Sequence, residues 1–122
     1  MIREGERFRI EAIDLSDERP EGGCPARDFL AKLVGPPQKR LTGLLARHAN
    51  GGPLLNEQQS REIKDGIYEF KTIQGARLLY FYPGTQRLTI LTHGFMKGAK
   101  LPAEVARAKR YRERYLAAFP IG

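Results

Sequence analysis

Three apolar segments follow one another closely in the second half of the chain, separated by short spacers that contain glycine. The segments span residues 67–73, 77–82 and 87–95, and Gly75 and Gly84 lie in the two spacers. Segments rich in β-branched and aromatic residues, joined by such spacers, are typical of β-hairpins. An antiparallel meander of three strands is therefore the simplest topology for this region.

Strand and helix patterns flank this meander. Residues 7–15 alternate in character along the chain, which predicts a first strand. Two short amphipathic helices follow, the first opening at Pro25 and the second burying Leu41 and Leu44 on one face. Pro102 opens a last helix. The predicted order is βααβββα, an α+β fold in which a small twisted antiparallel sheet packs against two N-terminal helices and a C-terminal helix.

Length and charge limit the class of protein. With 122 residues, no internal repeat and no linker-like stretch, we expect a single domain over residues 1–122. The chain carries 21 basic and 14 acidic side chains, a net charge of +7. Residues 62–122 hold 11 of the basic and 5 of the acidic side chains, so most of the excess lies there. A basic surface of this kind predicts a polyanionic partner.

Several routes to function have no signal in the sequence. One cysteine, Cys24, excludes an intrachain disulfide, and neither a leader-like apolar stretch nor a membrane-spanning run is present. We therefore expect a cytoplasmic protein that does not bind membranes. No nucleotide-binding loop or dinucleotide turn appears, and the two histidines, His48 and His93, fall in different predicted elements. We predict no cofactor and no metal.

Charged side chains on the predicted strands are the best candidates for chemistry. Alternation places Glu69 and Lys71 on one face of their strand, opposite Tyr68, Phe70 and Thr72. If the strands are neighbours, further charged side chains from the next two strands and the segment after them lie nearby. The candidate catalytic residues are Glu69, Lys71, Arg77, His93, Lys97 and Lys100. Such a cluster suits a phosphodiester substrate, because cations stabilise phosphate charge while a carboxylate, imidazole or lysine moves the proton. A solvated outer face of the sheet is the alternative interpretation.

The last helix carries a second set of basic side chains. The candidate RNA-binding residues are Arg107, Lys109, Arg110, Arg112 and Arg114. Their crowding predicts contact with RNA or with an acidic partner. Alternatively, these basic side chains only keep the exposed face of the helix solvated, without binding a partner.

Five pieces of the sequence, in order, resemble the HigB-like, phage-derived branch of the RelE/ParE toxin superfamily. The resemblance extends from about Phe8 to Leu116. The pieces are Gly23-Cys24-Pro25 with Phe29-Leu30, Lys64 to Phe70, Arg77 to Phe81, His93 to Lys97, and Lys100-Leu101-Pro102. This resemblance implies a RelE-like fold, with which the βααβββα order agrees.

The resemblance also implies a function. It implies the toxin of a type II toxin–antitoxin pair, a metal-independent endoribonuclease that cuts mRNA on the ribosome. The 2′-hydroxyl of the RNA would attack the adjacent phosphate, and Glu69 or His93 would move the proton. Arg77 and Lys97 would hold the phosphate oxygens, with Lys100 beside the leaving group. The implied partners are mRNA, the ribosome and a cognate antitoxin of the helix-turn-helix kind. Where the family commonly has a second lysine after Lys97, this chain has Gly98-Ala99.

Two alternatives from other classes stay open. One is a ParE-like toxin that binds DNA gyrase and cleaves nothing. The other is a non-catalytic module that binds RNA or an antitoxin.

Overall fold

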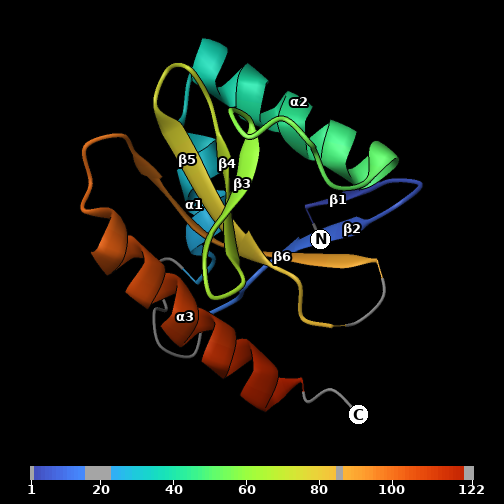
Figure 1. The fold of residues 1–122 in the computed structure, drawn as a ribbon, viewed down its shortest axis with the longest axis vertical. Helices are drawn as coiled ribbons and strands as arrows, with labels where there is room; N and C mark the ends of the chain where they lie inside the picture. Colours follow the sequence, from blue (N-terminus) through green and yellow to red (C-terminus); the bar gives the residue numbers. More distant parts are fainter. Residues whose placement is uncertain (1, 16–22, 85–86, 120–122) are drawn as a thin grey trace.

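The computed structural model describes residues 2–15, 23–84 and 87–119, which form one mixed sheet and three helices (Figure 1). The strands are β1 (Arg3–Glu4), β2 (Arg9–Ala12), β3 (Ser60–Lys64), β4 (Ile67–Lys71), β5 (Ala76–Phe81) and β6 (Leu88–Met96). Their order across the sheet is β1-β2-β6-β5-β4-β3. Every pair is antiparallel except β2 with β6, which is parallel.

The helices cover the two faces of this sheet. They are α1 (Pro25–Lys32), α2 (Pro36–Gly51) and α3 (Leu101–Ala118). One apolar core lies between the sheet and the helices α1 and α2, and it includes Leu41, Phe70 and Leu78. A second core lies between the opposite face and α3, and it includes Leu79 and Val105. Figure 1 shows α3 running along the sheet on the side away from α2. The α+β class is as predicted.

Proline and glycine set the helix boundaries. Pro25 and Pro36 occupy first-turn positions of α1 and α2, where the missing N–H of proline costs no hydrogen bond. Gly35 precedes α2 with a φ of 69°, a conformation that favours glycine. The Gly35-Pro36-Pro37 segment therefore ends the first helix, as predicted, and also begins the second.

Two features of the predicted fold need correction. The order βααβββα lacks the short strands β1 and β3, which lie at the two edges of the sheet. The sheet is also not wholly antiparallel, because β2 pairs with β6 in parallel, with Arg9 opposite Leu88. A hairpin spacer forces antiparallel pairing, whereas β2 reaches β6 only through a long connection that leaves either direction open.

Aromatic side chains of the meander fill the core beneath α2. Phe70 and Tyr80 stack with ring centroids 4.2 Å apart, and His48 of α2 packs edge-on against both. Tyr68 and Tyr82 surround the same group. These aromatic rings therefore serve as packing on the side of the sheet opposite the charged residues.

Candidate active site

Period-two alternation places a group of charged residues on the face of the sheet that α3 partly covers. Ile67 and Leu79 belong to the core under α3, and Glu69, Lys71 and Arg77 have the same parity on β4 and β5. Lys71 is the direct cross-strand partner of Arg77, and Glu69 is opposite Leu79. The predicted convergence of Glu69, Lys71 and Arg77 is thus seen in the strand register.

Glu69 is a buried carboxylate that meets two arginines. Its side chain is only 2% exposed. Nε of Arg61 lies 2.9 Å from its Oε1, and a terminal nitrogen of Arg77 lies 3.8 Å from the same oxygen. The arginine side chains are 44% and 19% exposed, so they lie nearer to solvent than the carboxylate does. A buried carboxylate needs such partners, because an unpaired charge in the interior is costly. We call Arg61, Glu69, Lys71 and Arg77 the charged face.

Arg61 is a member of this group that the sequence reasoning missed. It lies on β3, a strand that the predicted order lacks, and it pairs directly with Glu69 in the strand register. The signal that reveals it is Asp65-Gly66, a typical two-residue hairpin turn, with φ values of 52° and 79°. This turn folds Ser60–Lys64 back against β4 and places Arg61 beside Glu69.

His93 lies beneath α3 and is buried. Its side chain is 1% exposed, its Nε2 lies 2.9 Å from Oε2 of Glu104, and its ring meets Tyr111 edge-on. Burial lowers the pKa of His93 to about 4, although the Glu104 carboxylate acts in the opposite direction. The ring is therefore neutral near pH 7. Through these contacts with Glu104 and Tyr111, His93 of β6 holds α3 against the sheet.

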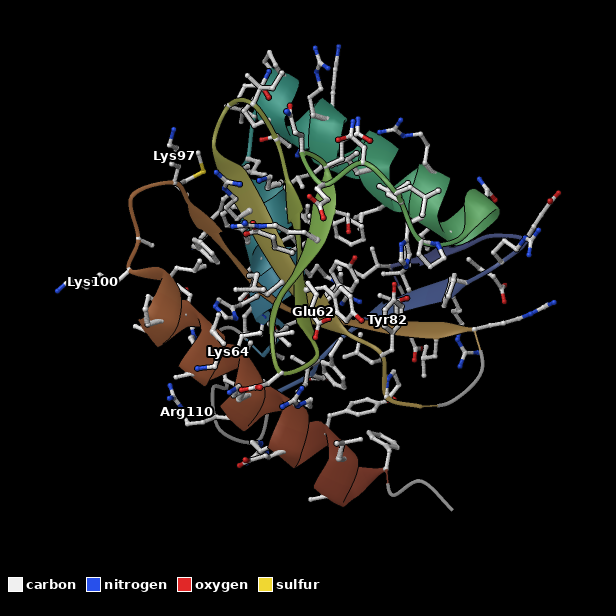
Figure 2. The ribbon with its side chains drawn as sticks, viewed as in Figure 1. Glu62, Lys64, Tyr82, Lys97, Lys100 and Arg110 are labelled. Carbon is white, nitrogen blue, oxygen red and sulfur yellow. The ribbon has the colours of Figure 1, made fainter. Side chains whose placement is uncertain are left out.

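Lys97 and Lys100 lie between β6 and α3 and are exposed. The backbone N–H of Lys97 donates to the carbonyl of Gly75, which places Lys97 beside the β4–β5 hairpin. Figure 2 shows both lysine side chains extending outward from this connection. Neither forms an ion pair with any residue that the structure describes.

The basic residues of α3 are not equivalent. Lys109 forms an ion pair with the carboxylate of Asp65, and Arg112 donates to the Asp65 carbonyl at 2.6 Å. Arg107 donates to the Tyr111 hydroxyl at 2.8 Å and lies over its ring. Arg110 is exposed and points outward from the helix (Figure 2). Arg114 lines a hollow beside β2. Lys109, Arg112 and Arg107 thus make contacts within the protein.

A metal-binding cluster and a membrane-spanning helix are both absent from the described residues. Among them, no cluster of three or more histidine, cysteine, aspartate or glutamate side chains has the arrangement to hold a metal ion. In the same part of the chain, no helix has the length and apolar character needed to cross a membrane.

The chain is similar to a known protein family in sequence and to a solved structure in fold. The family described as phage derived protein Gp49-like (DUF891) matches residues 28–114. A chain of the toxin–antitoxin complex RelBE2 from Mycobacterium tuberculosis is similar in structure, with a TM-score of 0.44 and 13% identity, over 76% of this chain and 94% of that chain. No curated protein matches the sequence significantly. The matched range of the family includes the whole charged face.

Proposed function

This chain belongs to the family of phage-derived Gp49-like proteins, and we propose that it is the toxin of a type II toxin–antitoxin pair, an endoribonuclease that cuts mRNA on the ribosome. The family match agrees with the phage-derived part of the sequence resemblance. We further propose that the chain is of the HigB-like branch and that it cleaves RNA.

The observation that carries the proposal is the meeting of Arg61 and Arg77 at the buried carboxylate of Glu69. Arginine binds phosphate through several donors and stays protonated, so two neighbouring guanidinium groups suit a phosphodiester. The 3.8 Å separation between Arg77 and Glu69 is longer than a hydrogen bond, so Arg77 is the more loosely held partner. An incoming phosphate draws Arg77 from the carboxylate and uncovers Glu69, while Arg61 keeps Glu69 in position.

The proposed reaction is an internal transfer within the RNA. The 2′-oxygen forms a bond to the adjacent phosphorus, and the bond from phosphorus to the 5′-oxygen breaks. Glu69 accepts the proton of the 2′-hydroxyl, and the departing 5′-oxygen takes a proton from a solvent water to leave as a hydroxyl. The products are a 2′,3′-cyclic phosphate and a free 5′-hydroxyl. Positioning and charge stabilisation supply most of the acceleration.

The remaining cations support this reaction. Lys71 lies opposite Arg77 on the same face and adds positive charge beside the phosphate. Lys97 lies beside the hairpin end of the face and serves the phosphate, and Lys100, at the start of α3, serves the leaving group. His93 is left out of the proton transfer, because its contacts with Glu104 and Tyr111 bury it under α3. On α3, exposed Arg110 offers RNA a contact, since it forms no ion pair with any described residue.

An antitoxin partner follows from this activity. An enzyme that destroys mRNA is tolerated only when a tightly bound partner keeps its free concentration low, as mass action requires. The net charge of +7 favours an acidic or wrapping partner. We propose a small antitoxin of the helix-turn-helix kind as that partner.

Arg77→Ala tests the proposal. We expect cleavage of mRNA in a translating extract to fall about a hundredfold or more, because a contact to the phosphate is lost in the transition state. Glu69 keeps its 2.9 Å contact with Arg61, so the loss in folding stability should be about 1 kcal/mol. The measurements are primer extension on the mRNA and thermal melting of each variant.

Lys32→Ala is the matched control, since it removes one exposed cation from the last turn of α1, on the opposite face of the sheet. It should cut at the parental rate. If Arg77→Ala melts normally and also cuts at the parental rate, the charged face is not the active site. If the parental protein leaves transcripts intact but damages DNA on expression, the gyrase-binding alternative replaces the ribonuclease. A protein that cuts nothing and leaves growth unaffected indicates the non-catalytic module.

A further inference from the structure

A groove of about 610 Å³ runs between α2 and the end of β4. Four cations line it: Lys39, Arg40 and Arg47 from α2, and Lys71 from β4. None of its described lining residues is acidic, and none of the four cations forms an ion pair within the described part of the chain. We call these four residues and the hollow between them the basic groove. Its charge is unneutralised, unlike that of Lys109 on α3.

We propose that the basic groove binds single-stranded RNA and holds the nucleotides that flank the cleavage site. This inference rests on the proposed function, since it extends the path of the same RNA strand. Lys71 belongs to both sites, because it lines the groove and is the cross-strand partner of Arg77 on the charged face. The charged face and α2 lie on opposite sides of the sheet, so a strand whose scissile phosphate lies at Arg77 passes around the end of β4 at Lys71 to reach the groove.

The row of cations on α2 has the length to follow a nucleic-acid backbone. Lys39 and Arg47 are eight residues apart, which corresponds to about 12 Å along the helix axis. All three α2 cations are exposed, so their long side chains are free to reach phosphate oxygens. Several cations in a row are the footprint expected for a phosphate chain rather than for one small anion.

The opposite wall of the groove favours RNA over an acidic peptide. It presents the residues Asn56, Gln58 and Gln59, and the exposed side chain of Ile73. Amide side chains hydrogen-bond base edges and ribose hydroxyls, and an exposed apolar side chain gives an unstacked base a surface to lie on. The backbone N–H of Lys71 donates to the Gln59 carbonyl at 2.9 Å, which fixes this wall against β4.

Gly43 provides the sharpest test of the groove. It lines the hollow on α2, and a Cβ atom built there meets nothing within 4 Å. Gly43→Glu therefore puts a negative charge into the groove without straining the backbone. The matched control is Gly51→Glu on the same helix, where a Cβ also meets open space and which does not line the groove.

The probe is a fluorescein-labelled oligouridylate whose 2′ positions carry methyl groups, so that it cannot be cleaved. Binding to the full chain is followed by fluorescence anisotropy at several salt concentrations. We expect Gly43→Glu to weaken binding at least tenfold and Gly51→Glu to leave it nearly unchanged. For Arg40→Gln/Arg47→Gln, the slope of log affinity against log salt should fall by about 1.4, since each phosphate contact contributes about 0.7 for a single strand.

Failure of the groove and failure of the proposed function are distinguishable. If Arg77→Ala abolishes cleavage while Gly43→Glu binds RNA like the parental protein, the groove inference is overturned and the active site stands. If Gly43→Glu loses binding while Arg77→Ala still cuts, the groove stands and the proposed active site falls. A poly-glutamate peptide that competes with the RNA at equal charge concentration would show an acidic polypeptide as occupant and overturn the RNA assignment.

Discussion

Gly94 lets the ring of Phe29 lie directly against β6. A Cβ atom at this position would overlap the Phe29 ring, so any residue larger than glycine forces α1 away from the sheet. Gly94 is also the direct partner of Leu78 in the strand register, within the core under α1 and α2. The absence of a Cβ atom at Gly94 therefore allows α1 to pack closely against β6, the strand next to β5 of the charged face.

Gly94→Ala should destabilise the fold by about 1 to 3 kcal/mol, which is the usual cost of overpacking a filled core. In the double variant Phe29→Ala/Gly94→Ala the loss should be smaller than the sum of the two single losses, because the smaller side chain makes room. Chemical denaturation measures all three variants. Gly43→Ala is the control and should raise stability, since its Cβ meets open space on a helix. Additive losses in the double variant would show that Phe29 is not the obstacle.

Part of the candidate site is predictable from single residues and part is not. Alternation alone places Glu69 on the same face as Lys71, and the hairpin spacing brings Arg77 beside them. The burial of His93 has no such signal, because a histidine on a strand looks the same whether or not a helix covers it. Only the docking of Glu104 and Tyr111 on α3 reveals its surroundings.

At the level of elements, the β3–β4 hairpin decides whether Arg61 reaches the charged face. The turn residues Asp65 and Gly66 both adopt positive φ values, and Asp65 also holds α3 through Lys109 and Arg112. Strand β3 is an edge strand whose side chains are mostly exposed, so it lacks the apolar alternation that marks its neighbours. For this reason its sequence resembles a loop, and only the Asp65-Gly66 turn indicates a strand on both sides.

Gly66→Ala should destabilise the hairpin by about 1 kcal/mol or more, because alanine is disfavoured at the left-handed φ of 79°. Gly66→Asn should cost less, since asparagine tolerates this conformation better. Thermal and chemical unfolding of the two variants supply the comparison. Equal losses for alanine and asparagine would attribute the effect to crowding against the Arg112 side chain, which lies 3.2 Å from the added Cβ, rather than to backbone strain.

At the level of the whole molecule, two buried histidines make folding sensitive to acid. His48 is fully buried among aromatic rings, its Nε2 lies 2.9 Å from the Thr89 hydroxyl, and burial lowers its pKa to about 4. His93 has a similarly lowered pKa. Because the unfolded chain binds these protons near pH 6.5 and the folded chain only near pH 4, stability is fully present above about pH 6.5 and falls between these values.

His48 alone should account for roughly 3 kcal/mol of this loss, because its pKa falls from 6.5 to about 4 on folding. Melting temperatures measured from pH 7.5 down to pH 4.5 should show the decline. His48→Gln keeps a polar partner for Thr89 but does not titrate, so its melting temperature should depend less steeply on pH, whatever its absolute stability. If His48→Gln has the same dependence of melting temperature on pH as the parental protein, other groups cause the acid sensitivity.

The sheet as a whole is where prediction from sequence fails most clearly. Local patterns identify β2 and β6 as strands but contain no information on which distant strand each will pair with. Arg9 pairs with Leu88 in parallel, and Ile13 and Leu15, just after β2, share a core with Val105 of α3, although these segments are far apart in the chain. The pairing of distant strands is determined by packing in the complete core and not by local sequence.

The central position of β6 has a consequence for the order in which the protein folds. Strand β6 lies between β2 and β5, so within the sheet β1 and β2 connect to β5, β4 and β3 only through it. Among the described strands β6 is made last, and α3 follows it. A nascent chain that lacks β6 therefore holds two separate pieces of a sheet and no completed second core. The sheet closes only once β6 has been made, and the second core forms only once α3 has followed it.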